Sequence, residues 1–218
     1  TMSNAADISG YSYSSAEGAH TQAYLWEPVL NELKTMPWGE GAGARRVFDL
    51  GCGNGATAAF LEKKGFNVTG VDPSTEGIKT ANENHPNLNL HEGSAYDDLK
   101  RRFGTFPALI SLEVVEHVYD PRSYAACVYD LLEPGGKAVI STPYHGYLKN
   151  VVIAITGNYD LHHNPLWDHG HIKFWSIDTL STLLEEAGFV DLRFLRVGRS
   201  IPALAKSMIA IAHKPAQR

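Results

Sequence analysis

The sequence predicts an α/β fold, a three-layer sandwich whose seven-stranded, mostly parallel sheet carries an antiparallel strand at its edge. Apolar segments of strand length alternate with amphipathic segments of helix length along most of the chain. A strand, a helix and a second strand follow one another within residues 47–71, and such units form parallel sheets. The 218 residues are enough for one large core and too few for two full domains.

The first half of the chain supplies strands and helices in alternation. A helix over residues 20–34 places Leu25, Val29 and Leu33 on one apolar face. The elements predicted to follow are strands over 47–50, 67–71, 88–90 and 108–112, and helices over 56–64 and after Pro73.

The second half completes the sheet. Asp120 is a good N-cap and Pro121 suits the first helical position, so a helix begins there, and Pro134-Gly135-Gly136 is expected to end it. The elements predicted after this turn are a strand over 137–142, helices over 147–155 and 176–187, and an antiparallel pair of strands over 190–197 and 205–212.

Composition and charge exclude several function classes. The formal net charge is −5, which argues against a broad nucleic-acid-binding surface. Two cysteines, Cys52 and Cys127, cannot build a disulfide framework, and neither a signal peptide nor an apolar run of transmembrane length is visible. We therefore expect a cytoplasmic protein, and the sequence leaves its oligomeric state open.

A glycine-rich loop follows the first predicted strand. Between Asp49 and Gly55, glycines alternate at positions 51, 53 and 55, where the missing Cβ permits a tight turn and the close approach of a ligand. Asp72 ends the second strand, 21 residues after Gly51, at the position from which a carboxylate accepts hydrogen bonds from a ribose. Together these features predict an adenosine-type cofactor at the carboxyl ends of the strands.

The order of glycines distinguishes the cofactor. A dinucleotide fold requires G-x-G-x-x-G, whereas this loop is G-x-G-x-G led by Asp49. With the turn after Asp72 and the approach to the fifth strand at 131–136, the loop resembles that of class I S-adenosylmethionine (SAM)-dependent methyltransferases, over residues 45–213. The resemblance implies a Rossmann-like methyltransferase fold with SAM as cofactor. It implies an N-terminal arm and cap helix over 1–40 and a methyltransferase domain over 41–218, with an acceptor lid at about 143–175.

The resemblance also implies which residues bind SAM. Gly51 and Gly53 would line its methionine part, and Ser94 stands where many relatives place an acid that contacts adenine. Cys52 has an alternative role as a small packed residue, and Tyr11 as an anchor of the N-terminal arm. The implied cofactor-binding residues are Asp49, Gly51, Cys52, Gly53, Asp72, Pro73, Ser94, Ala95, Leu112 and Glu113, with Tyr11 and His20 folding over from the arm.

The acceptor side is marked by acidic residues and histidines. Residues 113–117, Glu-x-x-Glu-His, resemble a segment of ubiquinone-biosynthesis O-methyltransferases and of small-RNA 2′-O-methyltransferases. In some of those relatives this segment binds a divalent cation, which here would involve Glu113, Glu116, His117 and His171. Many relatives with a similar segment hold no metal, and the sequence does not favour one. The candidate general bases are His117, His171 and His145.

We expect a SAM-dependent methyltransferase that acts on a hydroxyl of a small molecule, such as an aromatic, a quinol or a sugar. The alternatives are an RNA 2′-O-methyltransferase, which the net charge disfavours, an NAD-dependent oxidoreductase, and a catalytically idle cofactor-binding module. The predicted amphipathic helix over 147–155 is expected to pack on the core. Its alternatives are a wall for an apolar or aromatic acceptor and peripheral contact with a membrane.

Overall fold

A seven-stranded sheet forms the centre of the computed structural model, which describes residues 22–41, 43–167 and 170–216. Its strands are β1 (Arg46–Leu50), β2 (Asn67–Asp72), β3 (Asn89–Glu92), β4 (Phe106–Leu112), β5 (Leu132–Pro143), β6 (Val190–Val197) and β7 (Ser207–His213). They lie in the order β3-β2-β1-β4-β5-β7-β6. Strands β1 to β5 are parallel, and β7 runs antiparallel to both β5 and the edge strand β6. The predicted fold class is confirmed.

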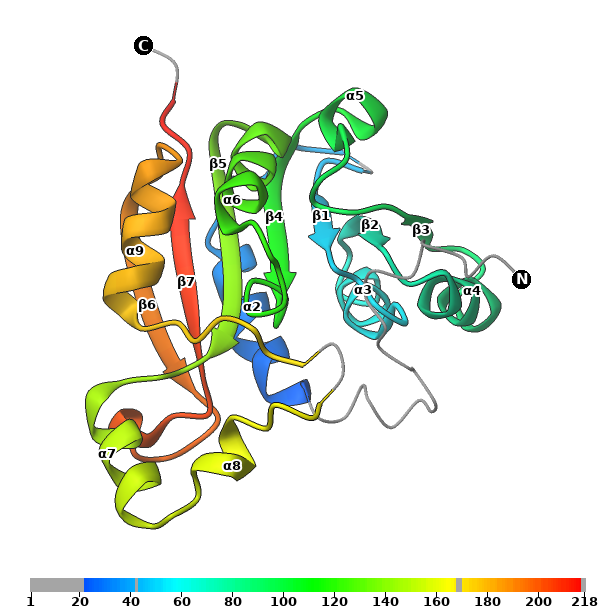
Figure 1. Cartoon of the computed structure of the whole chain (residues 1–218). Coiled ribbons are helices and arrows are strands. Elements are labelled where there is room, and N and C mark those ends of the chain that lie inside the picture. Colours follow the sequence, from blue (N-terminus) through cyan, green and yellow to red (C-terminus); the bar gives the residue numbers. More distant parts are fainter. Residues whose placement is uncertain (1–21, 42, 168–169, 217–218) are drawn as a thin grey trace.

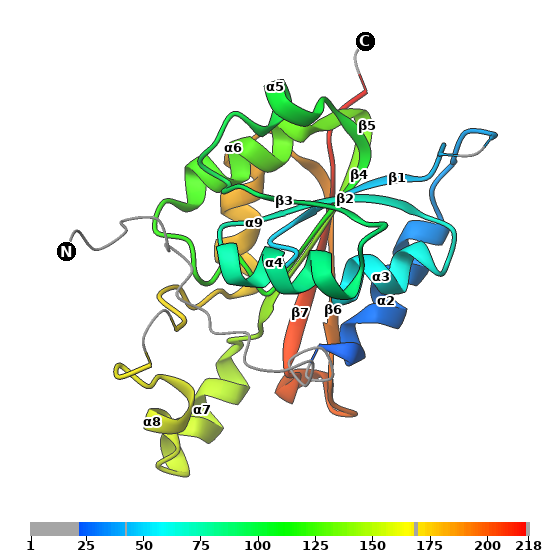
Figure 2. The same ribbon diagram turned by 90° about the vertical axis from the view of Figure 1, so that its right-hand side faces the viewer.

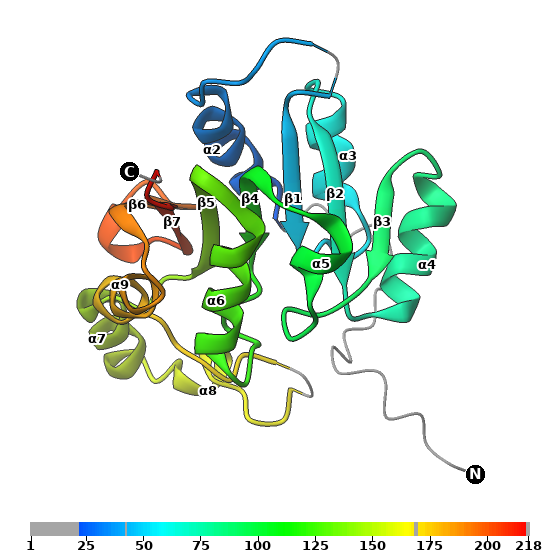
Figure 3. The same ribbon diagram turned by 90° about the horizontal axis from the view of Figure 1, so that it is seen from above.

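Helices cover both faces of the sheet, as Figures 2 and 3 show. One face carries α2 (Ala23–Lys34), α3 (Ala56–Glu62) and α4 (Thr75–Asn84), and the other carries α5 (Leu99–Phe103), α6 (Pro121–Leu131) and α9 (Ile177–Glu186). Neighbouring residues of a strand point to opposite faces. Val47 therefore packs in one core cluster with Leu25 of α2, and Phe48 packs in the other with Tyr124 of α6.

Two boundaries differ from the prediction because of long-range strand pairing. Helix α6 ends at Leu131, before the Pro134-Gly135-Gly136 turn, because Leu132 already pairs with Phe106 of β4. The pairing of β4 with β5 shifts register between Phe106 and Ala108, so the residues of the predicted turn, 134–136, lie within β5. The short helix α5 was not predicted; the side chain of Asp98 caps it by accepting a hydrogen bond from Arg101 N at 3.1 Å.

The lid segment contains α7 (Tyr147–Ile155) and α8 (Tyr159–His162), which project beyond the arrowheads of β1 and β4 in Figure 1. Helix α7 packs against α8 and against the short helix η1 (Pro202–Leu204). The expectation that α7 packs on the core was wrong: Ile153 is its one buried residue. Within the described ranges, no helix has both the length and the apolar character needed to cross a membrane.

Helix α2 belongs to the same core as the sheet. Its buried residues Leu25, Val29, Leu30 and Leu33 share a cluster with apolar side chains of β1 and β7. The division of the chain at residue 40 stays a prediction.

Candidate active site

The strand order places a crevice at the carboxyl ends of β1 and β4. The chain leaves β1 toward β2 and β3, and leaves β4 in the opposite direction toward β5. At such a reversal the loops after the two central strands separate, and ligands bind between them. The loops concerned here are residues 51–55 after β1 and residues 113–117 after β4, the two segments singled out from the sequence.

The glycine loop adopts a backbone that side chains rarely allow. Gly51, Gly53 and Gly55 have φ values of 86°, 52° and 79°, in the left-handed region. The amides of Gly51 and Cys52 both donate to the carbonyl of Val71, at 2.8 and 3.0 Å. A Cβ at Gly51 would collide with Val114, so only glycine allows the loop to contact the segment after β4.

Asp72 holds the glycine loop in place. Its Oδ2 accepts a hydrogen bond from Gly53 N and its Oδ1 accepts one from Ser74 N, both at 2.9 Å. The Ser74 side chain in turn caps α4 by accepting from Gly77 N. The residue predicted to bind the ribose is thus also the residue that shapes the loop.

Two further predicted cofactor residues lie buried beneath the loop. Asp49 is 2% exposed, and its Oδ2 has no hydrogen-bond partner within the described residues. Burial, and then the charge of Asp72, raise the pKa of Asp49 to about 7. Cys52 is buried against Gly70. A Cβ added to Gly70 would lie 2.8 Å from the Cβ of Cys52. Burial raises the pKa of its thiol, which fits a packed residue.

The remaining predicted cofactor residues occupy the neighbouring strand ends. Ser94 lies in a turn after β3, where its Oγ accepts from Tyr96 N at 3.2 Å and its N donates to Asp97 Oδ2 at 2.8 Å. Pro73 and Ala95 are half-buried, and Leu112 is buried in the core. Tyr11 and His20 lie outside the described residues.

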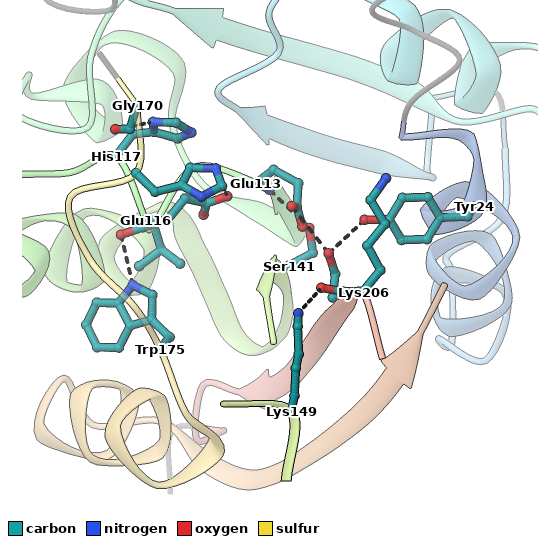
Figure 4. Close-up of polar contacts among 12 residues, drawn as sticks. Tyr24, Glu113, Glu116, His117, Ser141, Lys149, Gly170, Trp175 and Lys206 are labelled. Atoms are coloured by element: carbon teal, nitrogen blue, oxygen red, sulfur yellow. Dashed lines mark hydrogen bonds and ion pairs between the residues drawn. The ribbon is translucent and has the colours of Figure 1, made fainter. Parts of the chain in front are cut away.

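The two glutamates of the 113–117 segment face different surroundings (Figure 4). Glu113 has a φ of 57°, uncommon for a residue with a side chain. Its Oε1 accepts from Ser141 Oγ at 2.8 Å and its Oε2 from Ser207 Oγ at 3.3 Å. Burial raises the pKa of Glu113, and these two hydroxyls partly offset the effect. Glu113 therefore belongs to a network with Ser207 and Tyr24, whose hydroxyls lie 2.7 Å apart.

Glu116, His117 and His171 converge on one point. The potential ligand atoms of these three residues lie within 4.8 Å of one another, and His171 Nε2 lies 3.9 Å from Glu116 Oε1. Glu116 is 1% exposed, and neither of its carboxylate oxygens has a hydrogen-bond partner in the described part of the chain. Burial, and then the charge of Glu113, raise its pKa well above the usual range. Three of the four predicted metal ligands are brought together, and Glu113 is not among them.

The two histidines of this cluster make different contacts. His117 Nδ1 lies 3.1 Å from the carbonyl oxygen of Gly170 and must donate to it, which leaves the lone pair of the neutral ring on Nε2. The ring of His171 packs at 4.9 Å from that of His117. Burial, and then His117, lower the pKa of His171 to about 4, so its ring is neutral at physiological pH.

His145, the third candidate base, lies in a separate group of rings. It is buried, 5.3 Å from the ring of His163 and 5.2 Å from that of Phe174. Burial, and then Lys149, lower its pKa to about 4. The three-residue cluster around Glu116 does not include it.

Sequence reasoning missed residues that support the cluster from other elements. Trp175 is buried and its Nε1 donates to the carbonyl of Val115 at 3.1 Å, which anchors the 113–117 segment to the chain before α9. Lys149 Nζ donates to the carbonyls of Ala205 and Lys206, which ties α7 to the segment before β7. Ser141 could have been identified as a polar residue near the end of a predicted strand, whereas nothing in the sequence indicated that Tyr24 belongs to the network around Glu113.

The chain is similar to known methyltransferases over most of its length. Residues 19–193 match the family described as Methyltransferase domain. The chain is 29% identical over 181 residues to the ubiquinone biosynthesis O-methyltransferase of Aromatoleum aromaticum, covering 76% of this chain and 77% of the relative. It is 31% identical over 156 residues to the protein of the same name from Psychrobacter arcticus, covering 68% of this chain and 60% of that relative, less than two thirds of its length.

Solved structures show the same fold. A SAM-dependent methyltransferase from Thermotoga maritima superposes with a TM-score of 0.65 at 19% identity, covering 93% of this chain and 94% of that chain. The family match covers most of the sheet and both loops of the crevice. The chain therefore belongs to the methyltransferase domain family of SAM-dependent methyltransferases.

Proposed function

We propose that the chain methylates a hydroxyl group of a small molecule, of the aromatic, quinol or sugar class, at the cluster of Glu116, His117 and His171. The contact between Val114 and Gly51 carries this proposal, because it places the cluster beside the loop that would hold the cofactor. The names of the relatives support a quinol within this class. The net charge of −5 supports a small acceptor over RNA.

The residues around the glycine loop fit SAM. The backbone of the loop lies at the crevice, and a Cβ at Gly51 would collide there with Val114. Beneath the loop, Asp49 Oδ2 is buried without a hydrogen-bond partner among the described residues. Gly51 and Gly53 would line the methionine part, and Asp72 would accept from the ribose hydroxyls, since each carboxylate oxygen can accept more than one hydrogen bond. When bound, SAM supplies an electrophilic methyl group.

The chain's own task is to orient the acceptor and to take its proton. His171 is neutral at physiological pH, and Nε2 of His117 carries a lone pair, so either ring can accept a proton. Of the two, we propose His171 as the base, because its Nε2 lies 3.9 Å from Glu116 Oε1. An ionised Glu116 would stabilise the imidazolium that forms there.

A divalent cation at the cluster is the second candidate, and one observation favours it. A buried carboxylate without a hydrogen-bond partner is costly unless it is protonated or paired with a cation. Glu116 and the two imidazoles, when neutral, are a donor set that binds transition metals. Such an ion would lower the pKa of an acceptor hydroxyl held there, and His171 would then act as a ligand.

An acceptor screen tests the proposal. S-adenosylhomocysteine released from SAM is measured with phenols, quinols, sugars and carboxylates, and turnover is expected with a hydroxyl-bearing acceptor. His171→Ala should lower kcat by roughly 100-fold while leaving the Kd for SAM within about twofold. His162→Ala, at an exposed histidine of α8, is the matched control and should retain activity. Full activity of His171→Ala, or binding of NADH without binding of S-adenosylhomocysteine, would refute the proposal.

A further inference from the structure

A group of four aromatic rings lies between the end of β5 and the lid segment, and the proposed proton transfer does not use it. The rings of His145 and His163 are 5.3 Å apart. Phe174 packs edge-on against both, at 5.2 and 4.4 Å, and Tyr159 lies 4.4 Å from His163. We call these four side chains the ring group.

Two nitrogen atoms of the ring group are buried without a hydrogen-bond partner. They are Nδ1 of His145 and Nδ1 of His163, and no described residue bonds to either. His145 as a whole is 9% exposed. Most buried polar atoms in folded proteins have a partner, because leaving one unpaired costs free energy. Two such nitrogens on adjoining rings therefore indicate a polar ligand at this place.

Lys149 places a positive charge beside the ring group. Burial, and then Arg199, lower the pKa of Lys149 to about 8, so its ammonium is charged at physiological pH. After burial, this charge is the largest cause that lowers the pKa of His145 and of the other ring-group histidine. Its Nζ donates to the carbonyls of Ala205 and Lys206 at 3.2 and 3.4 Å, and an ammonium has three protons. A further acceptor can therefore bond to it.

Acidic side chains are scarce around the ring group, although the chain has a net charge of −5. In residues 144–167, Asp160 is the one acidic residue, and it is exposed. Glu113, at the end of β4, opposes the effect of Arg199 on the neighbouring lysine. Helix α7 begins at Tyr147, and no side chain caps its first turn, whose N–H groups favour an anion. The electrostatics at the ring group thus favour an anionic ligand.

One short segment joins the ring group to the Glu116 cluster. The amides of Ile172 and Lys173 donate to the carbonyl of Glu116 at 2.9 and 3.0 Å, and His145 N donates to the carbonyl of Trp175 at 3.2 Å. The Cα atoms of residues 172 and 175 are three residues apart, so at most about 11 Å separates them. A single small molecule can therefore contact both places.

We propose that the ring group and Lys149 bind an oxyanion, a carboxylate or a phosphate, that is carried by the methyl acceptor. The inference rests on the proposed function, in which the Glu116 cluster receives the hydroxyl of the same molecule. The neutral imidazoles each donate one N–H to the oxyanion, and the ammonium adds a charge-assisted hydrogen bond. The acceptor is then a phenol or quinol that also carries an acidic group.

Helix α8 gives this ligand its access. The helix has no buried residue, and it carries Tyr159 at its start and is followed directly by His163. A shift of α8 therefore exposes the two nitrogens at little cost, because few apolar contacts are lost. Phe174, which packs on both histidine rings, then limits the access of water to the bound oxyanion.

Binding of small anions to the full chain tests the site without SAM and without turnover, so its outcome is independent of the proposed reaction. Ligand-observed NMR titrations compare benzoate and phenyl phosphate with the neutral benzyl alcohol. The wild type should bind at least one of the anions roughly tenfold more tightly than the alcohol. His145→Phe keeps a ring without the nitrogens, and Lys149→Met removes the charge; each should abolish most of this preference. Lys149→Arg keeps the charge and should retain the preference within about threefold.

The ratio of the two affinities separates a loss of charge recognition from a general loss of structure, which weakens the anion and the alcohol alike. Lys100→Met, at an exposed lysine on α5, is the matched control and should keep the wild-type preference. Thermal unfolding checks that each variant is folded, and His163→Phe, at a half-buried position, replaces His145→Phe if that variant is not.

Three results would overturn the proposal. The first is a wild type that binds the anions no more tightly than the alcohol. The second is a folded His145→Phe or Lys149→Met variant with the full wild-type preference. The third is competitive displacement of the anion by S-adenosylhomocysteine, because the site then holds the carboxylate of the cofactor and not that of the acceptor.

Discussion

Val114 packs on Gly51 at a point where a Cβ on the glycine would collide with the valine side chain. The contact joins the loop after β1 to the loop after β4, at the reversal of strand order. One loop carries the proposed cofactor contacts and the other carries Glu116 and His117. A change at this contact should therefore affect both.

Gly51→Ala is expected to weaken SAM binding at least roughly tenfold, because Val114 must move and the loop must shift with it. The control is Gly65→Ala, whose φ of 85° is nearly the same but whose Cβ would meet nothing within 4 Å. Both variants carry a similar backbone strain, but only Gly51→Ala adds a collision, at a position inside the glycine loop. Isothermal titration with SAM measures the effect, and equal Kd values for the two variants would contradict the explanation.

Asp49 makes the free energy of unfolding depend on pH. Its pKa is about 7 in the folded chain and about 3.8 when unfolded, so between these values the folded state keeps a proton that the unfolded state releases. The free energy of unfolding should therefore fall as the pH rises from about 4 to about 7, and this contribution should level off above 7. Asp49→Asn should remove that fall and, at pH 8, stabilise the protein by a few kcal/mol, on the order of 1.4 per unit of pKa shift. Urea unfolding at pH 5 and pH 8 measures it, with exposed Asp178→Asn as the control; the same pH dependence in wild type and Asp49→Asn would disprove the assignment.

The cation candidate predicts that the protein binds Mn²⁺ in the absence of SAM. Glu116→Gln should weaken binding at least roughly tenfold because it removes the carboxylate of the cluster. Glu113→Gln should change it by less than about threefold, because that side chain is bonded to Ser141 and Ser207 instead. Titration followed by electron paramagnetic resonance reports the bound ion. If the wild type binds no Mn²⁺ and a chelator leaves turnover unchanged, His171 acts as a base alone.

Trp175→Phe should destabilise the protein by about 1–3 kcal/mol, because the buried carbonyl of Val115 loses its donor. It should also lower kcat, since Val115 lies within the segment that carries Glu116 and His117. Trp38→Phe is the control, because Trp38, in the loop before β1, donates from Nε1 to the carbonyl of Leu33, so its loss should leave kcat unchanged. Chemical unfolding and turnover are measured on both. A stable Trp175→Phe variant would show that the hydrogen bond contributes little.

Most of the fold and the glycine loop could be predicted from the sequence because both depend on local patterns. Alternating apolar segments specified the seven strands, and the cap at Asp120 marked the start of α6. Glycines at 51, 53 and 55 indicated a tight turn, and the structure has all three at positive φ. The end of α6 escaped prediction because Leu132 pairs with a strand far away in the sequence.

The sequence by itself determined the α/β architecture, the glycine loop and the acid that follows it, whereas the tertiary structure decided which side chains each acidic residue contacts. Glu113 and Glu116 are alike as sequence, yet Glu113 is bonded to Ser207, 94 residues away, and Glu116 faces His171. In the same way, α7 could be predicted as an amphipathic helix, but its attachment to the segment before β7 depends on a hydrogen bond from Lys149 to the carbonyl of Ala205, 56 residues away. A side chain's partners are supplied by distant segments that packing brings together, and local periodicity carries no record of them.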